Sequence, residues 1–348
     1  MKQAAREAAR EDETLTYMTK MLAGQITGAR RLEMIEIPRP DIEEREILVQ
    51  LQVGSICGSD LPYFLFDKSH PALAGASTSL PPTLSLHELV GFVAQTRSEQ
   101  FKEGDRVLAL PVIPHTGLAE YFVSSDDRAV LLPGGEATHL VLAQPLGTVV
   151  HAYRKLPEAL GTAVVLGQGP IGQLFTALLR SIGVAQLIAV DLLPERLNVS
   201  TRMGATHTVC GNATEVAAAI ETITEGKLVD LAVEAIGKEE TLNLAAKLVR
   251  RNGTLLAFGL PHKFNYDFAF HDFFWNEGRL ICSLGPTVDD FRTAVEMIST
   301  GVISVAPLVT HTFPFSRAQE AFTLFADRTD GVIKVVLTAQ DQTITGSK

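Results

Sequence analysis

Cysteine is scarce in this chain: only Cys57, Cys210 and Cys282 occur in 348 residues. Three scattered cysteines cannot form the disulfide framework of a small secreted protein, so we expect a reducing, cytoplasmic location. The first twenty residues, MKQAAREAAREDETLTYMTK, carry many charges and no apolar core. They therefore lack the features of a secretory signal, and we expect an extension to the fold there.

Positive charge and long apolar runs are also lacking. The formal net charge is −10, whereas nucleic acids and anionic membrane surfaces are bound by basic faces. The longest apolar windows are interrupted by Arg180 or by several glycines, so none predicts a membrane span. We therefore expect neither a nucleic-acid partner nor a membrane partner.

Hydrophobic residues, by contrast, make up 46% of the chain. Single cores stop growing at roughly 250–300 residues, so this length favours two domains. Short β-rich runs come first, and from Thr162 strands alternate with helices, which is typical of a doubly wound parallel sheet. We predict strands over 46–54, 89–96, 105–112, 119–125, 162–167, 185–191, 205–209, 229–237, 254–259, 279–285 and 331–339, and helices over 170–183, 194–204, 213–223, 238–250, 288–300 and 316–328.

The segment VVLGQGPIGQL places Gly167, Gly169 and Gly172 between a predicted strand and a predicted helix. In that context the glycines allow a tight turn, close approach of a pyrophosphate, and close helix–strand packing. The first turn of the helix, at Pro170 and Ile171, offers free N–H groups and the positive end of the helix dipole to the phosphates. The segment thus predicts a dinucleotide-binding site.

Asp191 ends the next predicted strand, where a carboxylate can accept hydrogen bonds from the ribose hydroxyls of an adenosine. A 2′-phosphate there would meet like charge, so the sequence predicts NAD rather than NADP. Arg196, one helical turn further on, either covers the adenosine or lies on a solvated helix face.

Three potential metal ligands lie in the β-rich part: Cys57 in SICGSD, and His87 and Glu88 in SLHELVGFV. A thiolate, an imidazole and a carboxylate are ligand types of a catalytic zinc with one open position. Their spacing alone fits a buried cysteine, a strand histidine and a surface carboxylate at least as well, but the nucleotide site downstream favours zinc. Adjacent strand residues normally face opposite sides, so His87 and Glu88 can share a metal only through local distortion or an exchange of ligands.

Together these motifs resemble the zinc-dependent medium-chain dehydrogenase/reductase family, which includes alcohol and sorbitol dehydrogenases. The resemblance covers roughly Met21 to Ala339 and extends to AQPLGTVVHAY, VDLAVEAIG, LLAFGLP and PLVTHTFPFSRAQEAF. It implies an α/β two-domain fold: a GroES-like β-rich catalytic domain (21–147), a Rossmann NAD-binding domain with a doubly wound parallel sheet (148–286), and a C-terminal return to the catalytic domain (287–348), after the extension over 1–20. A homodimer or homotetramer is also implied.

The resemblance assigns roles on the substrate side. It implies that Cys57 and His87 ligate one catalytic zinc and that Glu88 supplies the third bond. Ser59 holds the substrate hydroxyl and passes on its proton, while a hydride moves to the nicotinamide of NAD. The implied activity is the interconversion of a secondary alcohol or polyol and its carbonyl compound.

On the cofactor side, the resemblance places Gly259 and Leu260 beside the nicotinamide. Lys334 falls where the family has a basic residue near the pyrophosphate, although an exposed strand lysine would look the same in the sequence.

Several positions depart from the family pattern. Gln144 stands where members have Glu or Cys, and a neutral amide is a poor zinc ligand, so we predict that it hydrogen-bonds near the metal without ligating it. Pro62 replaces a histidine of the proton relay, and Leu86 replaces the glycine before the ligand histidine, adding bulk. The four-cysteine lobe of a structural zinc is absent, which leaves at most one zinc per subunit.

Two other functions stay open. A zinc-free NAD(P)-dependent quinone or enoyl reductase of the same fold would usually lack the cysteine and His-Glu ligands found here. A catalytically inactive NAD-binding protein is suggested by Gln144 and Pro62. Metal content together with turnover on a panel of alcohols distinguishes the three.

Overall fold

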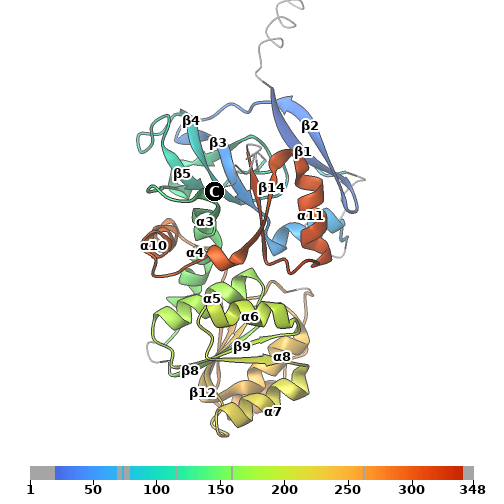
Figure 1. Ribbon diagram of the computed structural model, residues 1–348, viewed down its shortest axis with the longest axis vertical. Helices are drawn as coiled ribbons and strands as arrows, with labels where there is room; N and C mark the ends of the chain where they lie inside the picture. The colour runs from blue at the N-terminus through green and yellow to red at the C-terminus, as the bar shows by residue number, and fades with distance from the viewer. Residues whose placement is uncertain are drawn as a thin grey trace, which may run out of the picture. The chain divides into compact units, whose positions relative to one another are not determined.

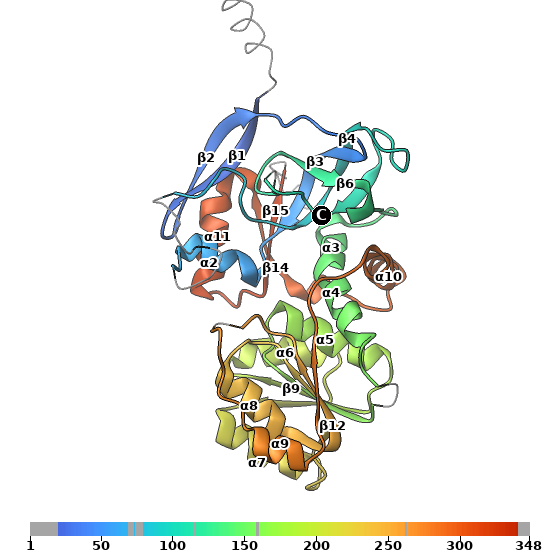
Figure 2. The same ribbon diagram turned by 180° about the vertical axis from the view of Figure 1, so that it is seen from behind.

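The computed structural model describes residues 20–68, 73, 79–114, 116–157, 160–261 and 263–339. The chain divides into two compact units, which Figure 1 and Figure 2 show from opposite sides. The first unit comprises Met1–Leu131, Phe313–Thr323 and Leu337–Lys348, and the second comprises Leu132–Thr312 and Leu324–Val336. The predicted N-terminal extension lies outside the described residues, except for Lys20, which begins the first strand.

Strands β1 to β7 form the framework of the first unit, and their pairings with one another are antiparallel. A two-stranded sheet pairs β1 (Lys20–Gly28) with β2 (Arg31–Pro38). A seven-stranded sheet has the order β14-β15-β3-β4-β5-β7, and β6 also pairs with β3. Its strands are β3 (Glu46–Ser55), β4 (Glu88–Thr96), β5 (Arg106–Ala109), β6 (Tyr121–Ser125), β7 (Ala129–Leu131), β14 (Val309–Pro314) and β15 (Lys334–Thr338).

β3 is the central strand of this sheet, and its sequence explains why. Ile47, Leu48 and Val49 follow one another and are all fully buried, so β3 has apolar side chains on both faces. Each such side chain contributes roughly 1.5–3 kcal/mol by leaving water. The strand therefore requires cover on both sides.

The C-terminal part of the chain returns to the first unit. The N–H of Ala339 donates to the carbonyl of Gln52 at 3.0 Å. Phe322 in α11 (Ala318–Asp327) packs on Phe64 in α2 (Leu61–Leu65), with ring centroids 5.3 Å apart. Residues from both ends of the sequence thus share one core.

The second unit contains a six-stranded parallel sheet of order β10-β9-β8-β11-β12-β13. Helices α5 and α6 cover one face and α7 and α8 the other (Figure 1), so the predicted doubly wound sheet is confirmed. The strands are β8 (Thr162–Leu166), β9 (Gln186–Asp191), β10 (His207–Cys210), β11 (Val229–Glu234), β12 (Val249–Ala257) and β13 (Arg279–Cys282). The helices are α3 (Ala137–Leu140), α4 (Ala143–Tyr153), α5 (Pro170–Ser181), α6 (Pro194–Arg202), α7 (Ala213–Ile223), α8 (Glu239–Leu248), α9 (Phe270–Trp275) and α10 (Val288–Ser299).

β12 differs from the expectation. The strand was predicted over 254–259, but it begins at Val249, and its pairing with β11 shifts register between Val229 and Leu231. The added residues pair with β11 through Val249 and Val229, and the Arg250 guanidinium next to this pair bonds the Asp230 carboxylate at 2.6 Å. Among the described residues, no helix has the length and apolar character needed to cross a membrane.

Candidate metal centre and nucleotide-binding loop

The Cys57 turn follows directly on β3. Cys57 caps a short 3-10 helix, Gly58–Asp60, and its own backbone N–H donates to the Asp60 carboxylate at 2.8 Å. Asp60 is buried, whereas Cys57 and Ser59 are half-buried. The side chain of Asp60 therefore fixes the backbone from which the thiol projects.

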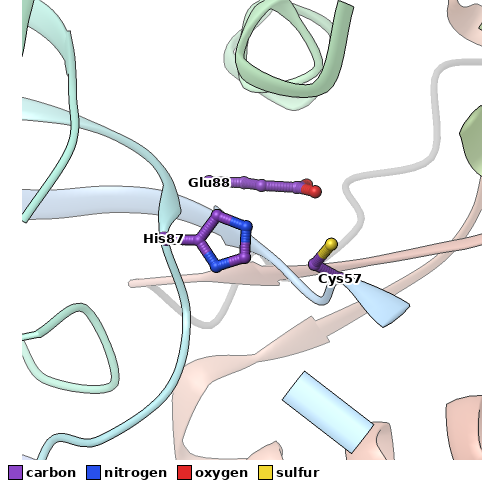
Figure 3. A group of neighbouring side chains, drawn as sticks. All are labelled: Cys57, His87 and Glu88. Carbon is purple, nitrogen blue, oxygen red and sulfur yellow. The ribbon is translucent and has the colours of Figure 1, made fainter. Parts of the chain in front are cut away.

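The structure brings Cys57, His87 and Glu88 together. One ligand atom from each, a sulfur, a ring nitrogen and a carboxylate oxygen, lies within 4.8 Å of the others. Figure 3 shows the three side chains directed into a common space. The pairing of β3 with β4 explains the convergence, because Ser55 is the register partner of Glu88 and the Cys57 turn begins just beyond it. This donor set, soft sulfur with imidazole and carboxylate, fits zinc.

A local distortion lets two adjacent residues point the same way. β4 begins at Glu88, so His87 precedes the strand. The two residues before His87 have left-handed backbone, with φ 121° at Ser85 and φ 60° at Leu86. The alternation of a regular strand therefore does not apply to His87 and Glu88. The Leu86 side chain, expected to add bulk near the site, is buried.

Hydrogen bonds hold the surrounding groups in place. The Ser55 hydroxyl donates to the Glu88 carboxylate, and both residues are fully buried. Burial lowers the pKa of His87, but its hydrogen bond with Cys57 and the charges of Cys57, Asp60 and Glu88 outweigh burial and raise that pKa to about 10. The surroundings of His87 thus favour the protonated, positively charged form of its imidazole.

The glycine-rich loop has the conformation that its sequence requires. Gly167 has φ 89°, which favours glycine. A Cβ on Gly172 would lie 1.7 Å from the Gly167 carbonyl oxygen, so no side chain fits there. A Cβ on Gly169 would have no atom within 4 Å, which leaves space for a ligand. Pro170 and Ile171 form the first turn of α5.

Asp191 is anchored at the end of β9. Its carboxylate accepts the N–H of Gln168 at 2.6 Å and that of Leu193 at 3.0 Å. A nitrogen of the Arg196 guanidinium lies 3.7 Å from the same carboxylate, and the Arg196 side chain is only 16% exposed. Arg196 is therefore neither fully solvated nor separate from the predicted ribose acceptor.

The remaining predicted cofactor residues lie in the second unit as well. Gly259 packs so closely that a Cβ on it would lie 2.1 Å from the Gly237 nitrogen, while Leu260 is exposed. Lys334 is buried at the start of β15 rather than exposed. Gln144 is buried on α4, and its role near a metal stays a prediction.

Comparison with known proteins now adds to this geometry. A model for the alcohol dehydrogenase GroES-like domain matches residues 43–159, and one for zinc-binding dehydrogenases matches residues 170–300. The chain belongs to the zinc-type medium-chain alcohol dehydrogenase family. It is therefore an oxidoreductase, as the sequence predicted.

Individual dehydrogenases match nearly the whole chain. Sorbitol dehydrogenase of Bacillus subtilis is 27% identical over 338 residues, which is 88% of this chain and 94% of that protein. Probable D-xylulose reductase A of Arthroderma otae is 27% identical over 341 residues, 87% of this chain and 93% of that protein. The crystal structure of 2R,3R-butanediol dehydrogenase from Bacillus subtilis has a TM-score of 0.78 and 24% identity, covering 92% of this chain and 100% of that one. The last comparison supports the fold.

Three residues of this dehydrogenase had no predicted role. Ser55 and Asp60 hold the metal-site groups, and neither the strand register nor the turn geometry that places them can be deduced from sequence. Gln168 is fully buried in the glycine-rich loop, where its amide oxygen accepts the hydroxyls of Thr176 and Ser200. The only signal of a role for Gln168 in the sequence was that it is a polar residue in an otherwise apolar loop.

Proposed function

We propose that the chain is an NAD-dependent dehydrogenase of a secondary alcohol or polyol, with a single zinc held by Cys57, His87 and Glu88. The observation that carries the proposal is the convergence of these three ligand types in a chain of a zinc-type dehydrogenase family. The names of the relatives, sorbitol dehydrogenase and xylulose reductase, support a polyol or its ketone as substrate.

The ligand set suits the expected chemistry. When bound, zinc acidifies a substrate hydroxyl, and NAD accepts a hydride. The Cys57 thiolate and the Glu88 carboxylate together balance the two positive charges of the metal, while neutral His87 completes three protein ligands. Glu88 is kept in place for this by the Ser55 hydroxyl.

Ser59 is proposed to receive the substrate proton at its Oγ. It lies two residues after Cys57 in the same turn and is half-buried, so its hydroxyl can meet both substrate and water. We expect Ser59→Ala to lower kcat by roughly 100-fold or more, as for loss of a general acid–base group. Zinc content should stay unchanged, and Ser59→Thr should retain most of the activity. Equal kcat for Ser59→Ala and wild type would remove Ser59 from the relay.

Asp191 supports NAD over NADP. A nucleotide cofactor follows from the family, and the choice between the two depends on charge at the ribose. The carboxylate is anchored by two backbone N–H groups, so it cannot easily turn away from a 2′-phosphate. Gly167, Gly169, Gly172, Gly259, Leu260 and Lys334 are the further residues proposed to bind the cofactor.

The experiment that tests the function is Cys57→Ala, with Cys210→Ala as the matched control because Cys210 is an exposed free cysteine. The expected result is loss of zinc and of alcohol turnover in Cys57→Ala, with NAD affinity kept, and no change in Cys210→Ala. Zinc-free wild type that still turns over a quinone or enoyl substrate would favour the reductase. Wild type that binds NAD but turns over neither class would favour the inactive protein.

A homodimer is the assembly that we propose, with a second copy covering the edge strand β13. β13 ends the parallel sheet, and neighbouring apolar side chains are exposed by between 47% and 82%: Phe270, Phe274, Trp275, Leu280 and Leu284. Patches of this kind mark interaction surfaces, and two antiparallel copies of an edge strand can pair with each other. Leu280→Asp should give a monomer in light scattering and Val302→Asp should not. A homotetramer would need a second surface.

The free cysteines support a reducing, cytoplasmic site of action.

A further inference from the structure

The four residues before His87, Thr83–Leu86, have an unusual backbone, and we call them the strap. Three of them have left-handed φ values: 67° at Thr83, 121° at Ser85 and 60° at Leu86. None is glycine, although such values favour glycine and are especially poor for a β-branched residue such as Thr83. Strained backbone of this kind persists only where surrounding contacts impose it, and it clusters at functional sites.

Asp60 supplies one set of these contacts. One carboxylate oxygen accepts the Ser85 hydroxyl at 2.9 Å and the Leu86 N–H at 3.0 Å. The other oxygen accepts the Cys57 N–H at 2.8 Å. A single buried carboxylate thus ties the backbone before His87 to the backbone of Cys57.

The segment 116–118 supplies a second set. The Gly117 N–H donates to the Leu86 carbonyl at 3.1 Å, and the Leu118 N–H donates to the Thr83 carbonyl at 3.3 Å. A Cβ on Gly117 would lie 2.7 Å from the Leu86 oxygen, so this approach needs glycine. The Thr83 N–H also donates to the Gly24 carbonyl at 2.9 Å. Hydrogen bonds therefore join the strap to Asp60, to the segment 116–118 and to Gly24.

We propose that the strap is a positioning device: Asp60 and Gly117 hold Ser85 and Leu86 in left-handed conformations, and this sets His87 toward Cys57 before any metal binds. The inference rests on the proposed zinc site. Asp60, Ser85 and Leu86 act through His87 and are positioning residues, since none of them supplies a donor to the metal. The backbone strain is the energetic cost of placing two adjacent residues, His87 and Glu88, at one site.

The strain itself is tested in metal-free protein by comparing Leu86→Gly with Leu86→Ala. Both variants lose the buried leucine side chain, so the difference between them reports the backbone. At an ordinary position alanine is the more stabilising of the two. At a left-handed position we expect Leu86→Gly to melt higher than Leu86→Ala, by roughly 2–4 °C. Equal melting temperatures, or a higher one for Leu86→Ala, would overturn the proposal.

The positioning role is tested by zinc affinity, measured by competition with a chromophoric chelator. Asp60→Asn replaces one acceptor oxygen by a donor, so it cannot hold both the strap and the Cys57 N–H. We expect zinc affinity to fall by roughly 10–100-fold, which is typical for loss of a partner of a metal ligand. The thiolate absorption band of the Co²⁺-loaded variant should shift as well.

Matched variants separate positioning from stability. Asp126→Asn removes another buried carboxylate of the same unit, one bonded to Arg45 and Ser98, and should lower the melting temperature without changing zinc affinity. Adding Leu86→Gly to Asp60→Asn should restore part of the lost affinity, whereas adding Leu86→Ala should not. If Asp60→Asn does not fold, the zinc affinities of the Leu86 pair test the positioning role: Leu86→Ala should bind zinc more weakly than Leu86→Gly, and equal affinities would overturn it.

The outcomes keep the two proposals apart. Wild type that binds no zinc overturns the metal site and, with it, the role of the strap. Wild type that binds zinc tightly while Asp60→Asn binds it equally well overturns the strap alone.

Discussion

Asp191 is held by the backbone before any nucleotide arrives, and this makes its charge a fixed feature of the site. Both of its oxygens accept backbone N–H groups and each keeps a lone pair for a ribose hydroxyl. We predict that Asp191→Ser narrows the preference for NADH over NADPH by roughly 10–100-fold, the range of one charge-assisted hydrogen bond. The measurement is kcat/KM for each nucleotide.

The control for that experiment is Glu221→Gln, an exposed carboxylate on α7, which should leave the preference unchanged. Wild type that uses NADPH as well as NADH would show that Asp191 does not select the cofactor.

Gly169 in the glycine-rich loop and Gly172 in α5 are predicted to have different roles. Gly172 is needed for folding, and Gly169 for binding NAD. Gly172→Ala should prevent stable folding, because its Cβ would overlap the Gly167 oxygen. Gly169→Ala should fold normally, because its Cβ would meet no protein atom, but should weaken NAD binding by filling space meant for phosphate. Thermal unfolding and nucleotide titration distinguish the two effects. Normal NAD affinity in Gly169→Ala would show that the phosphates lie elsewhere.

The contact between α4 and α10 predicts that the free energy of unfolding depends on pH. Burial raises the pKa of Asp290, but hydrogen bonds from Thr287 and His151 and the charge of Arg154 outweigh burial and hold it below its usual range. A carboxyl group with a lowered folded pKa stabilises the fold above its unfolded pKa of about 3.9 and loses that contribution as pH falls through the folded value. Asp290→Asn should therefore cost roughly 1–3 kcal/mol at pH 7. The difference from wild type should shrink in urea unfolding below about pH 4, and a constant difference would contradict this origin.

At the element scale, helices with local signals were predicted well. The helix over 213–223 begins at the predicted residue because the Asn212 side chain caps it, accepting the N–H groups of Thr214 and Glu215. β12 was misplaced at its start because its first residue, Val249, pairs with Val229 of β11, a residue distant in sequence. Short elements such as α2 and α9 have too few residues to show a period.

In the candidate site, too, some features follow from the local sequence and others depend on contacts between residues distant in sequence. Ligand types at Cys57, His87 and Glu88 are visible in the sequence, and the need for a distortion between the last two followed from strand geometry. Its location in the strap could not be predicted, since Thr83–Leu86 contains no glycine. The tertiary contacts of Asp60 override the local preference.

At the scale of the whole molecule, the three metal-site residues belong to the first unit and the glycine-rich loop to the second. We therefore predict that removing zinc with a chelator abolishes turnover and lowers the melting temperature, yet leaves NAD affinity within about twofold, a difference under ~0.5 kcal/mol. Readdition of zinc should restore turnover. A large loss of NAD affinity in the metal-free protein would show that the two sites depend on each other.

The strand order of the seven-stranded sheet also determines when each strand can find its partners during synthesis. β3, which ends in the Cys57 turn, lies between β4 and β15. During synthesis β4 emerges soon after β3, whereas β15 emerges only after all six strands of the parallel sheet, β8 to β13. β6 pairs with Glu46–Gln50 on the edge of β3 opposite β4, so only the rest of that edge, which leads into the Cys57 turn, keeps unpaired N–H and C=O groups until β15 has been made. The strand that leads into the metal-site turn is therefore made long before it is completed, and a chain stopped before Lys334 would expose that part of its edge to other chains.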